Sequence, residues 1–496
     1  MLARPLPTCF AVPLIAAFTT LCSLAADLPQ APQYLGDIRR DAQGQIITIT
    51  KPAAAALPGT SAIPPAVPDA SPAVPELLKP AAANQPTAKP AQGNPPQPKR
   101  AATGTAPTGA PHVATLLRVG PTHTLRTIAA AAAIAQDGDT VEIDAGNYVA
   151  DVATWRQDRL TLRGVGGPVR LLAAGASAQG KAIWVISGGQ VTVENINFSG
   201  AKVSDKNGAG IRFERGQLTV KHCVFLNNEN GILTAADPKA ELTIENSEFG
   251  YNGAGDGYSH NLYVGHIKKL TVKGSYFHHA NVGHLLKSRA AENQIFYNRL
   301  TDELGGTASY ELEFPNGGLA YVVGNIVQQA STTTNANTIA YGMEGYTWPK
   351  NELYLAYNTI VDDSVKGGFF LQHKPGLDKL VAANNVLVGK GSLDGGLKRI
   401  GADLAKRLIG KTEEAPPDKD TGELLTNHNL TTGWESFVQA SRYNYQPKGG
   451  DIAQFKTLPL TPVNGIRLEP ERQYLHTAQI SRLAPGPLMP GAVQLK

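Results

Sequence analysis

The middle of the chain repeats one short pattern, in which a run of alternating apolar residues is followed by Asn, His or Gly and then by an aromatic residue. The pattern is clearest in residues 191–198, 218–225, 242–249 and 270–277. Successive centres lie 24 to 33 residues apart. This spacing is typical of a solenoid in which each repeat forms one coil. Weaker copies are centred on Gly164, Asn298, Asn325, Asn358 and Asn385.

Each clear copy begins with a run such as Val-Thr-Val, and its β-branched residues favour a short strand over a helical turn. A single strand of this kind cannot bury its apolar face, so successive copies should stack about 4.8 Å apart in a parallel sheet. Asn suits the corner because it tolerates the left-handed backbone conformation. The pattern predicts an all-β fold, a single-stranded right-handed parallel β-helix. A second strand of each coil is expected at residues 210–214, 231–234, 261–265, 285–289, 310–314, 341–344 and 369–372.

Both ends of such a coil stack require a cap. Residues 124–135 predict an alanine-rich helix with Leu125, Ile128 and Ile134 on one side. A Gly-Asp-Thr-Val-x-Ile-x-x-Gly-x-Tyr segment follows at 138–148. This helix and segment resemble the N-terminal cap of the pectin lyase-like superfamily. The domain is therefore expected over residues 112–496, with a cap at 112–150, coils from about 158 to 440 and a closing segment at 441–496.

The first 111 residues are predicted to lie outside this domain. Residues 1–25 have one Arg, an apolar run and a small-residue cleavage site, so they predict a signal peptide and a periplasmic or secreted protein. Residues 26–50 form a short segment with one expected strand at 45–50. Residues 51–111 are rich in Pro and Ala, which predicts a disordered linker. Removal of the signal peptide leaves Cys223 alone, and we expect it to be a buried small hydrophobe.

The charge of the chain limits its partners only weakly. A net charge of +4 permits an acidic polymer as a partner, and no basic run predicts nucleic-acid binding. No segment is long and apolar enough to predict a membrane span. We expect a monomer that binds a polysaccharide, and the chemistry described below favours an acidic one.

Five of the eleven histidines lie between positions 260 and 284, which indicates a functional region. Alternation along the second strands predicts that Lys287 and Arg289 share the outer face of one coil, with Glu311 and Glu313 on the next. Tyr263 would lie one coil before this strip and Glu344 one coil after it. Adjacent His278 and His279 are expected to point apart.

Three interpretations of this strip remain open. The charges could form ion pairs that only stabilise the stack. A zinc ion could be held by His260, His266 and His284, although their spacing matches no known zinc motif. A divalent ion, with Ca²⁺ the candidate, could be held by Glu311, Glu313 and Glu344.

Residues 286–300 carry a second resemblance. Leu286-Lys287-Ser288, followed by Asn293-x-Ile295-x-x-Asn298-x-Leu300, is similar to the strand and corner that carry the catalytic lysine in the chondroitinase B and alginate lyase branch of the superfamily. The resemblance implies that Lys287 is the base. That branch has a calcium-binding Glu-x-Glu before the lysine and an Arg-His pair one coil later, and this chain has neither.

A lyase of this kind must neutralise the carboxylate of a uronate, remove its C5 proton and protonate the leaving oxygen. Crowding by Arg289 is expected to lower the pKa of Lys287, which suits a base. Arg289 would neutralise the carboxylate, and His284 or Tyr310 would donate the proton. Glu311 and Glu313 complete the catalytic set. The substrate-binding residues are predicted to be Tyr263, His260, Tyr310, Glu344, Tyr346 and Trp348.

The sequence therefore predicts an exported polysaccharide-active protein, with a lyase acting on an acidic polysaccharide as the leading hypothesis. A glycoside hydrolase that uses two of the glutamates is the second hypothesis. A non-catalytic carbohydrate-binding or envelope scaffold protein is the third. An open groove lined by the charges and aromatic rings would favour an enzyme. Charges that are all paired under a covering loop would favour the scaffold.

Overall fold

The computed structural model describes residues 38–40, 46–49, 112–333, 335–393 and 423–495. The predicted signal peptide and linker lie outside the described residues. In the segment before the linker, β1 (Ile38–Arg40) pairs antiparallel with β2 (Ile46–Ile49), so the single strand expected at 45–50 has a partner.

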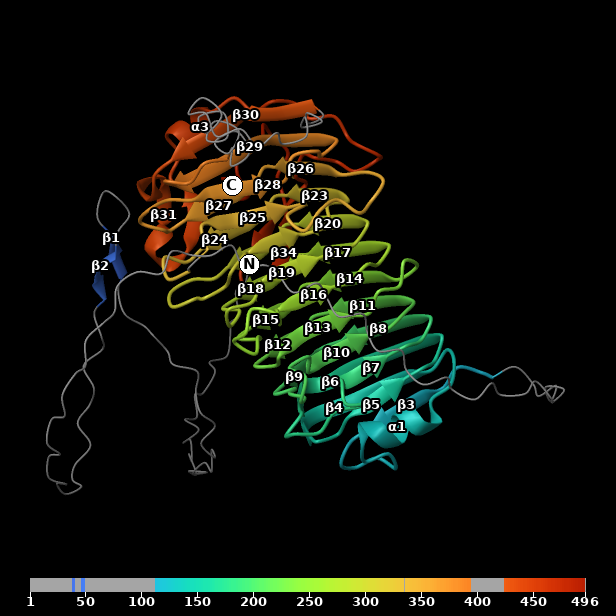
Figure 1. Cartoon of the computed structure of the whole chain (residues 1–496). Coiled ribbons are helices and arrows are strands. Elements are labelled where there is room, and N and C mark those ends of the chain that lie inside the picture. Colours follow the sequence, from blue (N-terminus) through green and yellow to red (C-terminus); the bar gives the residue numbers. More distant parts are fainter. Residues whose placement is uncertain (1–37, 41–45, 50–111, 334, 394–422, 496) are drawn as a thin grey trace, which may run out of the picture.

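Two long sheets with parallel pairing form the walls of a coil stack that rises from α1 to β30 (Figure 1). The outer face of the nine-stranded sheet carries the candidate site described below. Its strands are β5 (Ala153–Trp155), β7 (Ala182–Ile186), β10 (Ala209–Phe213), β13 (Asn230–Thr234), β16 (Leu262–Val264), β19 (Leu286–Ser288), β22 (Leu312–Phe314), β25 (Asn337–Tyr341) and β28 (Phe369–His373).

The second sheet has 19 strands and supplies two strands of most coils, joined at the repeated corner. Its strands before the corner include β8 (Gln190–Glu194), β11 (Gln217–Lys221), β14 (Glu241–Glu245), β17 (Lys269–Lys273), β20 (Glu292–Phe296), β23 (Leu319–Val323) and β26 (Glu352–Ala356). After the corner come β9 (Ile196–Ser199), β12 (Val224–Leu226), β15 (Glu248–Gly250), β18 (Tyr276–His278), β21 (Arg299–Thr301), β24 (Ile326–Gln329) and β27 (Thr359–Asp362). The remaining members are β3 (Leu116–Val119), β4 (Thr140–Val149), β6 (Arg159–Leu172), β29 (Lys379–Gly389) and β30 (Glu423–Thr432).

The corner residue adopts the left-handed conformation that was predicted for the repeat. Asn195 has φ of 59° and Asn246 has φ of 48°. In the later coils, however, the repeated Asn follows the left-handed corner residue, which is Tyr297, Gly324, Tyr357 or Asn384. Lys273 pairs with Phe296, so Asn298 aligns with Ser275 and not with Gly274. The predicted centres of the weaker copies after Gly274 were therefore displaced by one position.

These displaced asparagines form a buried ladder that joins the coils. The backbone N–H and the side-chain Nδ2 of each one donate to Oδ1 of the next, at 2.8 to 3.0 Å. Each amide thereby satisfies backbone groups that the turn leaves unpaired. The ladder consists of Asn298, Asn325, Asn358, Asn385 and Asn429.

The aromatic residue that ends each clear copy lies in the core. Phe198, Phe225, Phe249 and Phe277 stack with ring centroids 4.7 to 4.9 Å apart, which equals the distance between strands. Burial of each ring contributes roughly 1.5–3 kcal/mol. Cys223 is 1% exposed, and burial raises the pKa of its thiol to about 12, so the predicted buried cysteine is confirmed.

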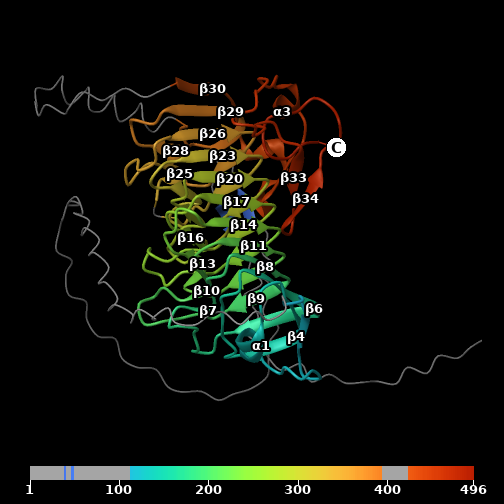
Figure 2. The same ribbon diagram turned by 90° about the vertical axis from the view of Figure 1, so that its right-hand side faces the viewer.

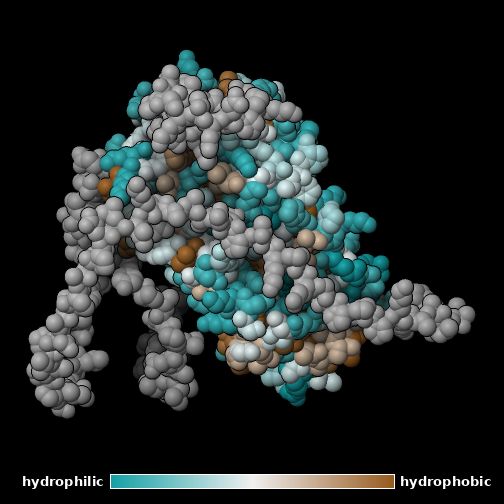
Figure 3. Space-filling model, in the orientation of Figure 1, coloured by the Kyte–Doolittle hydropathy of each residue, from teal (hydrophilic) through white to brown (hydrophobic). Residues whose placement is uncertain are grey.

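The N-terminal cap contains α1 (Ile128–Ile134), and the Thr127 side chain accepts a hydrogen bond from the Ala130 N–H. Ile128 and Ala131 are buried, but Ile134 is 53% exposed, so its predicted place on the core side was wrong. Six residues of helix place its side chain about 120° around the helix axis from that of Ile128. Apolar residues accordingly gather on the surface at this end of the molecule (Figure 3).

The closing segment covers one flank of the coil stack, as Figure 2 shows for β33 (Arg472–Leu475) and β34 (Gln479–Arg482). Its apolar side chains Phe437, Tyr443 and Tyr474 form one buried cluster with Tyr276 and Ile326 of the large sheet. In the structure we use the name closing segment for everything after β30, so it begins at η1 (Trp434–Ser436). It continues through β31 (Phe437–Gln439), η2 (Ala440–Arg442), β32 (Asn444–Pro447) and α3 (Asp451–Gln454). Among the described residues, no helix has the length and apolar character needed to cross a membrane.

Candidate functional site

Register places three of the predicted site residues in one column on the nine-stranded sheet. Tyr263 of β16 pairs with Lys287 of β19, and Lys287 pairs with Glu313 of β22. The next residue in the column is Ala340, not Glu344. The predicted juxtaposition of Tyr263, Lys287 and Glu313 is therefore present, while their chemical roles stay a prediction.

Four charged side chains form a continuous ion-pair group, which we call the charged quartet: Lys287, Arg289, Glu313 and Glu344. Lys287 Nζ lies 3.0 Å from Glu313 Oε2 and 3.0 Å from Glu344 Oε1. Arg289 Nη1 lies 2.7 Å from Glu344 Oε2. The Lys287 side chain is 12% exposed, whereas that of Glu344 is 35% exposed. Glu344 is thus the member of the quartet most open to solvent.

The charged quartet shifts the pKa of Lys287 in the direction opposite to the prediction. Burial acts to lower the pKa of Lys287, but the carboxylates of Glu313 and Glu344 outweigh it and raise this pKa. The same contacts overcome the effect of burial on the acids: the pKa of Glu313 is lowered, and that of Glu344 falls to about 2. The expectation that the pKa of Lys287 is lowered was wrong, because two carboxylates lie 3.0 Å from the ammonium and favour its charged form.

Two stacked imidazoles lie beside the quartet. The His284 backbone N–H donates to His260 Nδ1 at 2.9 Å, and the ring centroids are 4.4 Å apart. This hydrogen bond makes His260 Nδ1 an acceptor, so the ring carries its proton on Nε2. His284 Nε2 lies 3.0 Å from Glu313 Oε2. Burial lowers the pKa of both rings, and His284 is therefore a neutral partner of Glu313 near pH 7.

Glu311 does not belong to this group. It is fully buried, and neither carboxylate oxygen has a hydrogen-bond partner among the described residues. Burial, and then the nearby Asp302, raise its pKa well above the usual value. β22 begins only at Leu312, so Glu311 lies at the corner before the strand. The equivalent residue one coil earlier is Leu285, which is also buried. Alternation does not hold at this corner, and the prediction that Glu311 shares an outer face with Glu313 was wrong.

The metal sites considered from the sequence are not assembled. Glu311 lies apart from Glu313 and Glu344, and His266 packs against Trp348, with ring centroids 5.7 Å apart, rather than joining His260 and His284. No group of three or more His, Cys, Asp or Glu side chains within the described ranges could hold a metal ion. Calcium binding itself stays a prediction that a direct titration would test.

Glu344 reaches the quartet from a loop that folds back over the earlier coils. The predicted strand at 341–344 is instead β25, which ends at Tyr341. The Glu344 N–H donates to the Pro315 carbonyl at 2.9 Å, and Trp348 Nε1 donates to the Arg289 carbonyl at 3.1 Å. The hydroxyl of Tyr346 donates to the Lys374 carbonyl. Tyr346 and Trp348 therefore hold this loop in place, in addition to any contact with a substrate.

An open cleft of about 520 Å³ lies beside the quartet. Tyr263, which is half-buried, and Arg289 line one end, with the guanidinium carbon 5.9 Å from the centre of the Tyr263 ring. Lys181 and Arg212 line the cleft further along, and both pair with Glu214, at 2.7 and 3.3 Å. The sequence reasoning missed these two cations. Arg212 could have been found, because it lies in a predicted second strand two coils before Tyr263.

The remaining predicted substrate-binding residues lie behind this opening. His260 is 2% exposed. Tyr310 is half-buried and meets the edge of the His284 ring, with centroids 4.9 Å apart. Neither side chain is among those that line the cleft. Of the predicted aromatic residues, Tyr263 alone lines this cleft within the described part of the chain.

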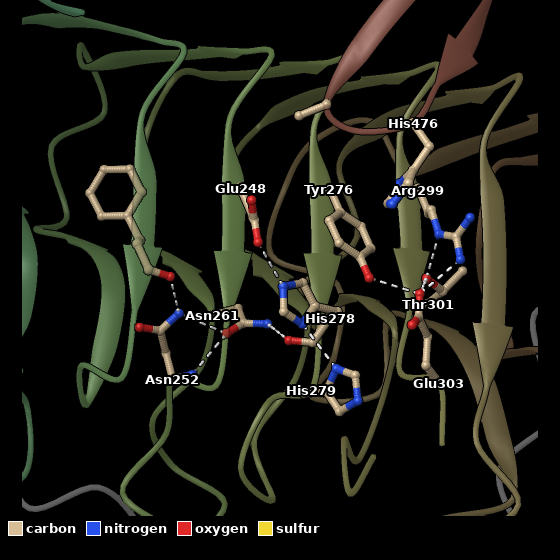
Figure 4. A network of polar contacts seen from close by, with 12 residues as sticks. Glu248, Asn252, Asn261, Tyr276, His278, His279, Arg299, Thr301, Glu303 and His476 are labelled. Atoms are coloured by element: carbon tan, nitrogen blue, oxygen red, sulfur yellow. Dashed lines mark hydrogen bonds and ion pairs between the residues drawn. The ribbon is translucent and has the colours of Figure 1, made fainter. Parts of the chain in front are cut away.

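The histidine cluster of the sequence is divided between two faces, and Figure 4 shows the second group. His278 Nδ1 lies 2.9 Å from His279 Nδ1, so the expectation that these rings point apart was wrong. His278 Nε2 lies 3.2 Å from Glu248 Oε1. Asn261 donates to the His278 carbonyl at 2.8 Å and connects this group to the coil that carries His260.

The same network anchors the closing segment. Glu303 Oε1 accepts hydrogen bonds from the Tyr276 hydroxyl and from Arg299 Nη2, each at 2.8 Å, as drawn in Figure 4. Arg299 Nη1 donates to the Tyr443 carbonyl at 3.1 Å. The ring of His476 packs edge-on against Tyr276 at 5.1 Å. These contacts give the second group a structural role in attaching the segment.

Comparison with known families agrees with the coil geometry. The family model described as "Right handed beta helix region" matches residues 124–302. The fold of the chain is a right-handed parallel β-helix. The right-handed parallel β-helix that the repeat predicted is thereby confirmed at the level of the fold.

Three solved structures are similar to this β-helix protein at low identity. Pectate lyase Pel9A is 11% identical, with 78% of this chain and 97% of that chain covered and a TM-score of 0.36. A PL6 family polysaccharide lyase from Pseudopedobacter saltans is 12% identical, with 65% and 94% covered and a TM-score of 0.29. A pectin methylesterase from Aspergillus niger is 13% identical, with 66% and 87% covered and a TM-score of 0.26. No curated protein matches the sequence.

Proposed function

We propose that this β-helix protein is exported and binds an acidic polysaccharide in the cleft beside the charged quartet. The observation that carries the proposal is the pairing of an aromatic ring with a guanidinium at the cleft, formed by Tyr263 and Arg289. A sugar ring can pack on Tyr263 while its carboxylate meets Arg289. Lys181 and Arg212 add two cations along the cleft, which share the single carboxylate of Glu214. This arrangement suits a polymer with one carboxylate per sugar.

The reaction that we propose for this site is β-elimination. A base removes the C5 proton of a uronate, the electron pair forms the C4–C5 double bond, and the C4–O bond breaks as its oxygen takes a proton. Arg289 would stabilise the negative charge that develops on the carboxylate. Lys287 is the candidate base, and its raised pKa means that it is a cation at neutral pH. Elimination through Lys287 would therefore require alkaline conditions.

A specific observation favours a second function, carbohydrate binding without catalysis. Lys287 and Arg289 are both paired with carboxylates, and the loop that carries Glu344 and Trp348 covers them. The hydrolase hypothesis has less support, since it needs one protonated carboxyl group as a general acid. The pKa values of Glu313 and Glu344 are both lowered, which leaves the two groups ionised. The pKa of Glu311 is raised, but this carboxyl group is fully buried and does not line the cleft.

The experiment is a panel of alginate, pectate, chondroitin and bacterial exopolysaccharide, incubated with the full chain. Calorimetry measures binding, and ultraviolet absorbance measures new unsaturated uronate ends. A lyase produces both signals, and Arg289→Ala should abolish both. Lys379→Ala is the matched control, because Lys379 pairs with Glu423 at 2.6 Å on the other sheet. Binding without new absorbance would identify the non-catalytic function, and the absence of binding to every glycan would refute the proposal.

A further inference from the structure

A second cleft lies under the closing segment, on the flank that Figure 2 shows beside β33 and β34. Its volume is about 910 Å³. One part of its wall consists of Pro470, Pro485, Leu483 and Leu488, which are apolar. Another part carries the guanidinium groups of Arg472 and Arg482. This cleft is separate from the site on the nine-stranded sheet, since none of its lining residues belongs to that sheet.

The two arginines are held directly opposite one another. Arg472 of β33 pairs with Arg482 of β34 in the antiparallel register of the hairpin. Like charges at directly opposed positions destabilise a strand pair. Neither guanidinium has an ion pair or hydrogen bond with any of the described residues, and both side chains are exposed. The hairpin thus holds two neighbouring cations whose charges the described protein does not neutralise.

Neither acid that lines the cleft forms an ion pair with Arg472 or Arg482 among the described residues, and three arginines of the lining outnumber its two acids. Glu471 binds Arg467, with Oε1 and Nη1 2.6 Å apart. Glu469 Oε1 accepts a hydrogen bond from the Leu460 N–H at 3.3 Å. Both acids therefore have partners of their own, while Arg472 and Arg482 have none among the residues described. The local excess of positive charge lies at the cleft.

The hairpin is rigidly attached, so the pair has a defined position. Tyr474 is two residues from Arg472 and shares its face of the strand, and it is buried in the cluster that contains Tyr276. The Glu471 N–H donates to the Tyr297 hydroxyl at 3.2 Å. The attachment fixes the backbone next to Arg472. A ligand would therefore meet a preformed site instead of ordering a loose strand.

We propose that Arg472 and Arg482 form an oxyanion-binding site, in which one carboxylate or phosphate group bridges the two guanidiniums and the apolar wall receives the rest of the ligand. Two guanidiniums can present parallel N–H groups to the oxygens of one such anion. The anion removes the repulsion between the strands, so binding also stabilises the hairpin. The volume of the cleft fits a sugar acid or a sugar phosphate.

The test is thermal unfolding and calorimetry of the full chain with either inorganic phosphate or a galacturonate oligosaccharide. We expect at least one of them to raise the unfolding midpoint of the natural protein. Arg482→Gln should weaken its binding about tenfold, the loss of one charge-assisted contact. The variant without ligand should unfold at the same temperature as the natural protein or higher, since a repulsion is removed. Comparison of the two ligands distinguishes a phosphate site from a carboxylate site.

Three outcomes would overturn the proposal. The first is that neither anion binds the natural protein. The second is that Arg482→Gln binds the anion as tightly as the natural protein does. The third is that Arg482→Gln lowers the unfolding midpoint equally with and without ligand, which would indicate a structural role. Lys268→Gln is the matched control, because it removes an exposed cation that pairs with Glu241 at 2.6 Å on another coil. Arg289→Ala separates this site from the first one. It should leave binding at the hairpin intact even if no polysaccharide binds beside the charged quartet.

Discussion

Lys287 Nζ lies 3.0 Å from Glu344 Oε1, although the two residues are 57 positions apart in the sequence. Glu344 is not on the strand that stacks two coils beyond Lys287, where the column position is occupied by Ala340. It arrives from the following loop, and its second oxygen binds Arg289. One carboxylate of the protein thus occupies both cations that a bound uronate would need.

This relationship predicts that Glu344→Gln strengthens the binding of an acidic oligosaccharide. The variant removes an anion that competes for Lys287 and Arg289, and a gain of about tenfold corresponds to one charged contact. Calorimetry with a defined uronate oligosaccharide measures the change. Weaker binding would show that Glu344 contacts the ligand itself, as the sequence predicted.

The rate of elimination, if the polysaccharide is cleaved, should depend on pH in a way that identifies the base. Contacts with Glu313 and Glu344 outweigh burial and raise the pKa of Lys287 above its usual 10.5, so a reaction that uses its neutral amine still accelerates as pH rises beyond that value. The pKa of His284 is lowered below 6.5, so a reaction that uses this ring reaches a plateau near neutrality. The pH profile of kcat/KM for new unsaturated ends distinguishes the two residues.

Glu311→Gln should raise the unfolding temperature, and by more at pH 8 than at pH 4. The carboxyl group is buried without a hydrogen-bond partner in the described parts of the chain, and burial holds its pKa in the folded protein well above 4.5. Folding therefore favours the protonated carboxyl group. The stability that this group contributes is fully present below pH 4.5, the pKa of the unfolded chain, and is lost as pH rises towards the higher pKa of the folded protein. Glutamine cannot ionise and avoids this loss. An equal or negative shift at both pH values would mean that the carboxyl has a compensating partner.

Asn325→Ala should destabilise the fold by about 3 kcal/mol, the cost of leaving several buried polar groups without partners. Asn325 Oδ1 accepts from both the backbone and side chain of Asn298, and its Nδ2 donates to the Ile295 carbonyl at 2.8 Å. Asn207→Ala is the control, since that asparagine is exposed. Chemical denaturation of both variants provides the comparison. Similar stabilities would argue against a stabilising ladder.

Local sequence patterns were sufficient for the coil stack. The Val-Thr-Val runs before Asn195 and the equivalent strands are paired in the structure as their alternation predicts, and the four phenylalanines stack as their spacing requires. The later asparagines were displaced by one position because two adjacent corner residues can hold Asn: one adopts the left-handed backbone, and the other directs its amide along the stack. A single sequence does not distinguish these two uses of the same side chain.

The candidate site could be predicted from the sequence only in part. Period-two alternation and the repeat length by themselves determined that Tyr263, Lys287 and Glu313 share a column, because strands that stack in register must align such residues. Only the tertiary structure decided that Glu311 turns inward at a corner and that Glu344 neutralises Lys287. The sign of a pKa shift depends on the distances between charges, and the distance from Lys287 to Glu344 was set by a loop that follows no repeat.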